Sequence, residues 1–257
     1  MLKEIVLSIQ AYFEAHRFIV KNRLWKWILI PGLIYTILFL LGIYFFWTSS
    51  NVAIEWMLAK TGVRTWLNSM HESWLNFFFI VGQVIFRLLL LLFYFSLFKF
   101  LFLILGAPVF AYLSELTESI LENKSFPFSL TQFLKDIFRA IKLSCINLIW
   151  QSVYLISLLV LSFIPVLGWV TPLVVLLIDC FYWGFSMLDY SSERNKLTVS
   201  ESMDLIHHHR GLAMGNGLVF YMMHFIPVIG WIFAPSYAVI AATLSLHQAR
   251  KTNVLNH

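Results

Sequence analysis

Four long stretches of this chain carry almost no charge, and they limit it to a membrane fold. Residues 27–54, 143–178 and 211–249 contain no Asp, Glu, Lys or Arg, and residues 74–105 contain only two such residues. A helix needs about 20 apolar residues to cross the hydrocarbon core of a bilayer. The sequence therefore predicts an all-α integral membrane protein.

Composition excludes several other classes of protein. Hydrophobic residues make up 60% of the chain and charged residues 12%, whereas a soluble domain has roughly 25% charged residues. A soluble enzyme, a free nucleic-acid binder and a disordered chain are therefore excluded, and we expect no nucleic-acid partner. The chain has no Walker motif, no nucleophile elbow and no His-Glu-x-x-His. We expect neither enzymatic activity nor a cofactor, and no metal site, although His207–His209 form a short histidine tract.

The first two apolar stretches predict spanning helices over 27–47 and 74–105. Trp27 and Trp47 lie near the two ends of the first stretch, as aromatic residues do at membrane interfaces. A continuous helix over 74–105 would be about 48 Å long. It would exceed the bilayer thickness, so we expect it to tilt or to project into water.

The other two apolar stretches are too long for single spans and predict helical hairpins over 143–188 and 211–248. Their tips nearly repeat each other: Phe163–Trp169 matches Phe225–Trp231 at six of seven positions, with an offset of 62 residues. Both tips read Pro-Val-x-Gly-Trp. We interpret the hairpins as two copies of one unit.

The sequence leaves open whether the hairpins are re-entrant or span the bilayer. Arms 212–226 and 231–247 would be about 22 and 25 Å long as helices, which is short of the ~30 Å hydrocarbon core. Arms 143–164 and 170–188 are long enough to cross.

The hairpin tips are candidate substrate-binding positions: Gly168, Trp169, Gly230 and Trp231. A helix that begins after each glycine would offer free N–H groups and the positive end of its dipole to an anion. Alternatively, each tip is only a tight turn. In both cases a side chain should be disfavoured at the glycine. On a shared pathway the tips should converge in the protein or its oligomer, and as simple turns they should lie apart.

Helices at the membrane surface are expected to connect these segments. Residues 1–22 place an apolar stripe along one face, which predicts an amphipathic interfacial helix. Ser129 with Gln132, and Thr198 with Glu201, match the capping-box pattern that opens a helix.

The basic residues predict cytoplasmic N- and C-termini. In that orientation fourteen Lys and Arg residues lie on the cytoplasmic side, and the single external loop has only Lys60 and Arg64. This asymmetry satisfies the positive-inside rule.

Charges inside the apolar stretches are candidates for function. Arg87 is a candidate substrate-binding residue because a charge within the membrane is costly to maintain. It could instead pack against protein or water within an oligomer, and we expect a homo-oligomer. We expect Lys99 to extend toward the membrane surface. Asp179 is expected to pair with Arg87 or to relay a proton.

The chain resembles the CysZ-like family, which is related to the etoposide-induced membrane proteins. The resemblance covers most of the chain and implies a single membrane domain over 1–257. It also implies an inner-membrane protein with two long spanning helices and two re-entrant hairpins. Bacterial CysZ members are associated with sulfate uptake for cysteine synthesis. The residues that carry the resemblance are Ile30-Pro31, Ala107-Pro108-Val109-Phe110, Phe163–Trp169, Asp189-Tyr190 with Lys196, and Phe225–Trp231.

One part of the chain departs from the family. The resemblance implies a glycine and two arginines that bind sulfate just before the first spanning helix. Here the segment reads Arg23-Leu24-Trp25-Lys26-Trp27. Lys26 keeps one cation, Trp25 replaces the other, and Arg23 stands where the glycine would be. Lys26 and Arg23 are therefore the candidate anion-binding residues, and Lys offers a point charge instead of a bidentate fork.

Two functions fit these features. The first is a transporter or channel for a small inorganic anion, with sulfate as the candidate, in a bacterial inner membrane. The alternative is a membrane scaffold or membrane-remodelling protein without transport activity, whose hairpins wedge into one leaflet.

Overall fold

The computed structural model describes residues 1–60, 73–123, 130–162, 164–194 and 197–251. All regular secondary structure in these residues is helical, which confirms the prediction of an all-α protein. The helices are α1 (Leu2–Asn22), α2 (Trp25–Lys60), α4 (Ser73–Glu122), α5 (Leu130–Ser162), α6 (Pro165–Arg194), α7 (Val199–His208), α8 (Arg210–His224) and α9 (Ile229–Lys251).

Helices α2 and α4 extend well past the apolar stretches that predict them. They contain 36 and 50 residues, which correspond to about 54 and 75 Å. Helix α4 continues through Pro108 to Glu122. A proline removes one backbone hydrogen bond, and the residues that follow, from Ser114 to Glu122, favour a helix enough to continue it. Hydropathy therefore identifies the apolar part of each helix but not its ends.

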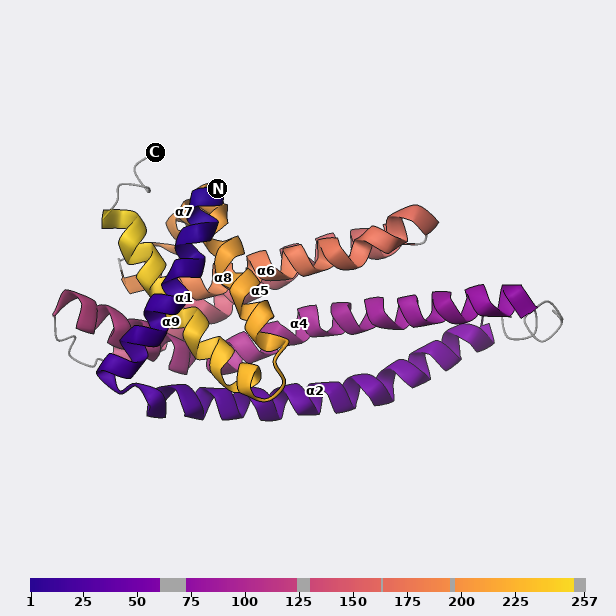
Figure 1. The fold of residues 1–257 in the computed structure, drawn as a ribbon, viewed down its shortest axis with the longest axis horizontal. Helices are drawn as coiled ribbons and strands as arrows, with labels where there is room; N and C mark the ends of the chain where they lie inside the picture. Colours follow the sequence, from indigo (N-terminus) through magenta and orange to yellow (C-terminus); the bar gives the residue numbers. More distant parts are fainter. Residues whose placement is uncertain (61–72, 124–129, 163, 195–196, 252–257) are drawn as a thin grey trace.

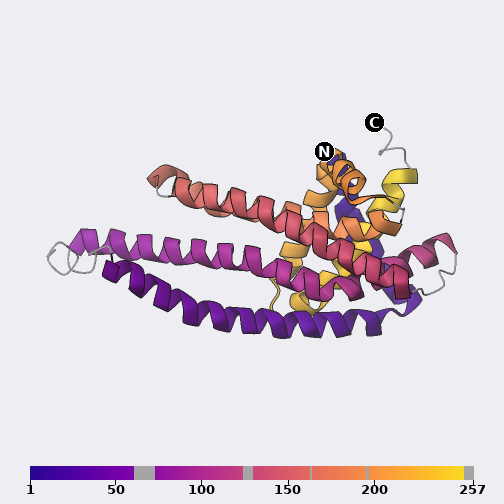
Figure 2. The same ribbon diagram turned by 180° about the vertical axis from the view of Figure 1, so that it is seen from behind.

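The helices form two groups that cross each other. Figure 1 shows α2 and α4 side by side along the long axis, with the α5–α6 hairpin extending in the same direction. Helices α1, α8 and α9 run across this group and pack on one another toward one end of the molecule. Figure 2 shows the same crossing from behind.

Five helices in the described part of the chain are long and apolar enough to cross a membrane. These segments are Trp25–Ser50, Leu90–Glu122, Ile137–Ser162, Leu167–Ser192 and Ile229–Lys251. Helix α8 has only 15 residues and is not among them. The protein is an integral membrane protein.

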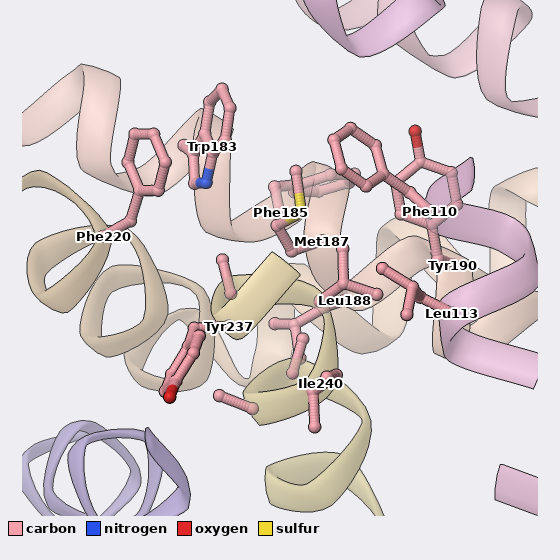
Figure 3. Close-up of a cluster of buried hydrophobic side chains, with 14 of the residues drawn as sticks. Phe110, Leu113, Trp183, Phe185, Met187, Leu188, Tyr190, Phe220, Tyr237 and Ile240 are labelled. Carbon is pink, nitrogen blue, oxygen red and sulfur yellow. The ribbon is translucent and has the colours of Figure 1, made fainter. Parts of the chain in front are cut away.

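An aromatic and aliphatic cluster joins the two groups of helices (Figure 3). The rings of Trp183 on α6 and Phe220 on α8 are stacked, with their centroids 3.8 Å apart. Phe110 of α4 and Ile240 of α9 belong to the same buried cluster. Because lipid tails are as apolar as these side chains, close packing stabilises such a cluster more than exclusion of water does.

Three glycines let the helix backbones approach closely. A Cβ atom on Gly217 of α8 would lie 1.8 Å from the carbonyl oxygen of Cys180 on α6. At Gly184 of α6 it would lie 1.9 Å from the carbonyl oxygen of Ala213 on α8. A Cβ atom on Gly32 of α2 would likewise lie 2.0 Å from the carbonyl oxygen of Ile232 on α9. Small residues at helix crossings are typical of membrane bundles.

Helix α1 is fastened to α8 by hydrogen bonds. The Ser8 hydroxyl donates to the Leu212 carbonyl, and the Tyr12 hydroxyl donates to the Asn216 carbonyl, both at 2.8 Å. The other face of α1 exposes apolar side chains, among them Phe13. Of the predicted apolar stripe, Tyr12 is buried and Val6 and Phe13 are exposed, and the interfacial position of α1 stays a prediction.

Asp189 joins three helices near the end of α6. Its Oδ1 atom accepts a bond from Arg139 Nη2 of α5 at 2.9 Å and one from the Ser202 hydroxyl of α7 at 2.5 Å. Helix α7 opens with the predicted capping box of Thr198 and Glu201. The other predicted box begins at Ser129, which lies outside the described residues.

Candidate functional site

Helix α1 ends with Arg23 in a left-handed conformation, with φ 55° and ψ 40°. The Arg23 N–H donates to the Val20 carbonyl at 3.4 Å, and the Leu24 N–H donates to the Ile19 carbonyl at 3.1 Å. These two bonds form a Schellman motif, in which glycine usually takes the left-handed position. The motif ends α1 and turns the chain directly into α2.

The α1–α2 joint, residues 23–26, exposes two cationic side chains. The side chains of Arg23 and Lys26 are both exposed. The first turn of α2 contains no acidic residue, so no carboxylate there offsets the positive end of the helix dipole. The Trp25 ring lies edge-on to His16 and Phe233, at centroid distances of 6.3 and 6.1 Å. Trp25 therefore attaches α2 to α1 and α9 and adds no charge.

The two hairpin tips share backbone geometry as well as sequence. The Gly168 N–H donates to the Ile164 carbonyl at 2.8 Å, and the Gly230 N–H donates to the Ile226 carbonyl at 2.9 Å. Each bond joins equivalent positions of the repeat. The repeat in sequence thus includes a repeated backbone hydrogen bond, although α6 begins at Pro165 and α9 begins only at Ile229.

A side chain is disfavoured at both tip glycines, as predicted. A Cβ atom would lie 2.5 Å from the Ser162 carbonyl oxygen at Gly168 and 1.8 Å from the Met223 carbonyl oxygen at Gly230. The cause is close approach of backbone, not a positive φ at either glycine. In the second tip the positive φ, 62°, occurs at Val228.

The tips lie far apart within one chain and have different surroundings. Figure 1 shows the α5–α6 tip at the far end of its hairpin and the α8–α9 tip close to α2. The side chain of Trp169 is 75% exposed. Trp231 turns inward, where its Nε1–H donates to the His224 carbonyl at 3.0 Å and its ring lies 4.8 Å from that of Phe39. A single chain therefore does not bring the two tips together.

A cavity of about 690 Å³ lies among α2, α4, α6 and the α8–α9 hairpin. Most of its lining is aromatic or aliphatic, and its charged residues are Arg87, Lys99 and Asp179. The Arg87 guanidinium lies 5.7 Å from the centroid of the Trp47 ring. Of the second hairpin tip, Phe225, Pro227 and Trp231 line the cavity.

A buried ion pair lies beside this cavity. Lys99 Nζ is 2.8 Å from Asp179 Oδ1. Asp179 also accepts hydrogen bonds from the Ser96 hydroxyl at 2.5 Å and from Gln151 Nε2 at 2.6 Å. The network ties α4, α5 and α6 together and satisfies a carboxylate that would otherwise be very costly to bury.

The prediction for Lys99 and one of the two alternatives for Asp179 were wrong, and the proton relay by Asp179 stays a prediction. Lys99 does not extend to the membrane surface, because it is only 5% exposed and Asp179 on α6 faces it. Asp179 therefore pairs with Lys99 and not with Arg87. Periodicity does not indicate which helices are neighbours, so the partner could not be predicted. Gln151 was overlooked, although an uncharged polar residue within the charge-free stretch of α5 was the available indication.

The histidine tract makes separate contacts. His209 Nδ1 donates to Glu4 Oε1 at 2.8 Å, whereas His208 Nδ1 lies 2.7 Å from the Asp204 carbonyl oxygen. Burial, followed by the nearby Arg210 charge, lowers the pKa of His207. Among the described residues no group of three potential ligands can hold a metal ion.

This chain is similar to known proteins over most of its length. The family model for sulfate transporter CysZ/etoposide-induced protein 2.4 matches residues 11–235. Sulfate transporter CysZ of Pseudomonas aeruginosa (strain LESB58) is 28% identical over 184 residues, which are 70% of this chain and 74% of that protein. Sulfate transporter CysZ of Pseudomonas syringae pv. tomato is 26% identical over 203 residues, which are 77% of this chain and 80% of that protein.

The family match includes the α1–α2 joint, both hairpin tips and the residues that line the cavity. Its range, 11–235, covers most of the sequence and begins within α1. The resemblance noted from the sequence is thus confirmed, and this chain belongs to the sulfate transporter CysZ/etoposide-induced protein 2.4 family.

Proposed function

We propose that this chain transports a small inorganic anion across the membrane, with sulfate as the leading candidate. The relatives described above are named sulfate transporters. The observation that carries the proposal is the joint between α1 and α2, where Arg23 and Lys26 are exposed at the start of a membrane-capable helix.

The chemistry of this joint suits an oxyanion. The Arg23 guanidinium can hold two oxygens of sulfate with its planar fork, and the Lys26 ammonium adds a point charge. Free N–H groups in the first turn of α2 add to the positive potential. Because Trp25 packs on α1 and α9, the second cation comes from Arg23. Arg23 thus takes the place of the arginine that the family resemblance implies at position 25.

Uptake of radiolabelled sulfate into proteoliposomes tests this proposal. We expect the wild-type protein to give uptake above that of empty liposomes. Lys26→Ala should lower uptake much more than Lys251→Ala, because Lys251 is exposed at the distant end of α9. Equal losses in the two variants would mean that only overall charge matters, and would overturn the proposed site.

The alternative function is a membrane scaffold without transport activity. The names of the relatives favour transport over this alternative. Folded protein that gives no more uptake than empty liposomes, for sulfate and for other small anions, would support the scaffold.

The hairpin tips are proposed as further contacts along the anion's path. Because the tips are separate within one chain, they can meet only if a second copy contributes its own tip, and we propose a homo-oligomer for this reason. Light scattering in detergent measures the number of copies. Trp169→Leu should lower sulfate uptake if this exposed tip contacts the anion, and a monomeric mass would contradict a shared pathway. Arg87 is considered separately below, because its surroundings favour a different ligand.

A further inference from the structure

The cavity among α2, α4, α6 and α8 is a poor site for a hydrated inorganic anion. Its lining consists mainly of apolar side chains such as Phe39, Leu91, Phe95 and Trp183. Transfer of an isolated anion from water into such surroundings costs several kcal/mol or more of free energy. Lys99 offers no compensation, since Asp179 already neutralises it at 2.8 Å.

The length of the cavity matches a lipid tail. Along α2 the lining runs from Trp47 to Tyr35, and along α4 from Arg87 to Phe102. At 1.5 Å per residue these distances are about 18 and 22 Å. One leaflet contributes about 15 Å to the hydrocarbon core. An acyl chain that enters beside Trp47 and Arg87 can therefore lie along both helices.

The cavity is also open to the membrane at the same end. Its exposed lining residues at this end are Ile43, Trp47 and Leu88, and Phe225 and Pro227 of the α8–α9 tip are exposed as well. The membrane-capable part of α2 ends at Ser50 and that of α4 begins at Leu90. Trp47 lies three residues before the end of the membrane-capable segment of α2, and Arg87 lies three residues before the start of that of α4. Both are therefore close to a level at which lipid headgroups would meet the hydrocarbon.

Arg87 supplies a charge suited to a phosphate. Its guanidinium lies over the Trp47 ring, 5.7 Å from the ring centroid, so the ring helps to fix its orientation. A guanidinium has five N–H donors and can bind a phosphate oxygen in addition to partners within the protein. The positive charge of Arg87 therefore lies at the end of the apolar cavity at which a lipid headgroup would be found.

We propose that this cavity binds one anionic phospholipid, with an acyl chain between α2 and α4 and the headgroup phosphate on Arg87. The ligand is a component of the surrounding bilayer, distinct from the anion proposed above as substrate. The lipid would fill the space beside the Lys99–Asp179 pair and keep water away from it.

Native mass spectrometry of the detergent-purified protein tests the proposal with two probe lipids that have the same acyl chains. These are phosphatidylglycerol, which is anionic, and phosphatidylcholine, which is neutral overall. We expect the wild-type protein to retain phosphatidylglycerol about fivefold better, which corresponds to one cationic contact. Arg87→Gln should abolish this preference, and Arg87→Lys should keep most of it. Arg17→Gln is the matched control, because Arg17 is exposed on α1, and should leave the preference unchanged.

A second variant tests the position of the tail. Leu91→Trp fills the cavity without changing a charge, so it should lower retention of both lipids. Addition of millimolar sulfate or inorganic phosphate should not displace the bound lipid, because most of its contacts are made by the tail. Equal retention of both lipids by the wild-type protein, normal retention by Leu91→Trp, or displacement by inorganic anions would each overturn the proposal. None of these readouts depends on sulfate uptake, so the lipid site and the transport function can fail separately.

Discussion

Arg23 holds a backbone conformation that costs an L-residue roughly 1–2 kcal/mol relative to glycine. The Schellman motif at the end of α1 requires this conformation. We predict that Arg23→Gly raises the free energy of unfolding by about 1 kcal/mol and lowers sulfate binding, because it relieves strain and removes a cation. Thermal unfolding in detergent and sulfate binding measure the two effects.

A matched control is available on the same helix. Arg17 is exposed within α1, where glycine costs about 1 kcal/mol relative to a good helix former. Arg17→Gly should therefore lower the Tm. The left-handed position would have no energetic importance if both glycine variants lowered the Tm equally.

Lys99 and Asp179 depend on each other because both are buried. We predict that Lys99→Ala or Asp179→Ala alone lowers the free energy of unfolding by about 3–5 kcal/mol, since each leaves an uncompensated buried charge. The double variant Lys99→Met with Asp179→Leu should be more stable than either single variant. A double-mutant cycle of unfolding measurements gives the coupling. Additive losses would show that the two charges are independent.

Single residues are the scale at which the sequence predicts least. The family resemblance marked Arg23 and Lys26, and the cost of a charge in the membrane marked Arg87. However, the partner of Lys99 depends on which helix faces α4, and no local pattern in the sequence contains that information. The left-handed conformation of Arg23 was not predicted, because arginine rarely takes it. The glycine that the family resemblance implies at this position was the available indication.

At the scale of helices, the second hairpin tip contains two backbone positions with opposite requirements. Gly230 has no room for a Cβ atom, whereas Val228 has a φ of 62°, which is strained for a β-branched residue. We predict that Gly230→Ala lowers the free energy of unfolding by about 1–3 kcal/mol and that Val228→Gly raises it. Thermal unfolding of both variants checks the signs, and a loss of stability in Val228→Gly would contradict this description of the tip.

The charge-free stretches predicted the helices well but did not predict where each helix begins and ends. The tip motif also predicted close backbone contact at Gly168 and Gly230, because proline and glycine restrict the backbone in recognisable ways. The extension of α4 through Pro108 could not be predicted in this way. Its last turns lie beyond residue 105, and Pro108 would ordinarily indicate that a helix ends there.

At the scale of the whole molecule, the proposed orientation places both termini in the cytoplasm. Figure 1 shows the start of α1 and the end of α9 on the same side of the molecule. Lys60 and Lys251 are exposed at the ends of α2 and α9. In a variant with Cys145 and Cys180 replaced by Ala, we predict that an impermeant maleimide added to intact cells labels Lys60→Cys. Lys251→Cys should react only after lysis. The reverse pattern would invert the orientation.

The crossed arrangement of the two helix groups was not predictable from this sequence. Glycines at 32, 184 and 217 mark the crossings, but a glycine within an apolar stretch does not indicate which helix it will meet. The length of the charge-free stretches and the repeated tips predicted the two hairpins. The contacts between them had to come from the structure.

The crossing of α6 and α8 limits how this protein can move. At Gly184 and Gly217 each backbone rests directly on a carbonyl of the other helix. No flexible side chain separates the two backbones at this crossing. The two helices therefore cannot slide along each other and must move as one unit. A transport cycle must therefore flex elsewhere. Gly32 fixes α2 on α9 in the same way, so motion within the bundle must occur at contacts made by side chains, away from these backbone crossings.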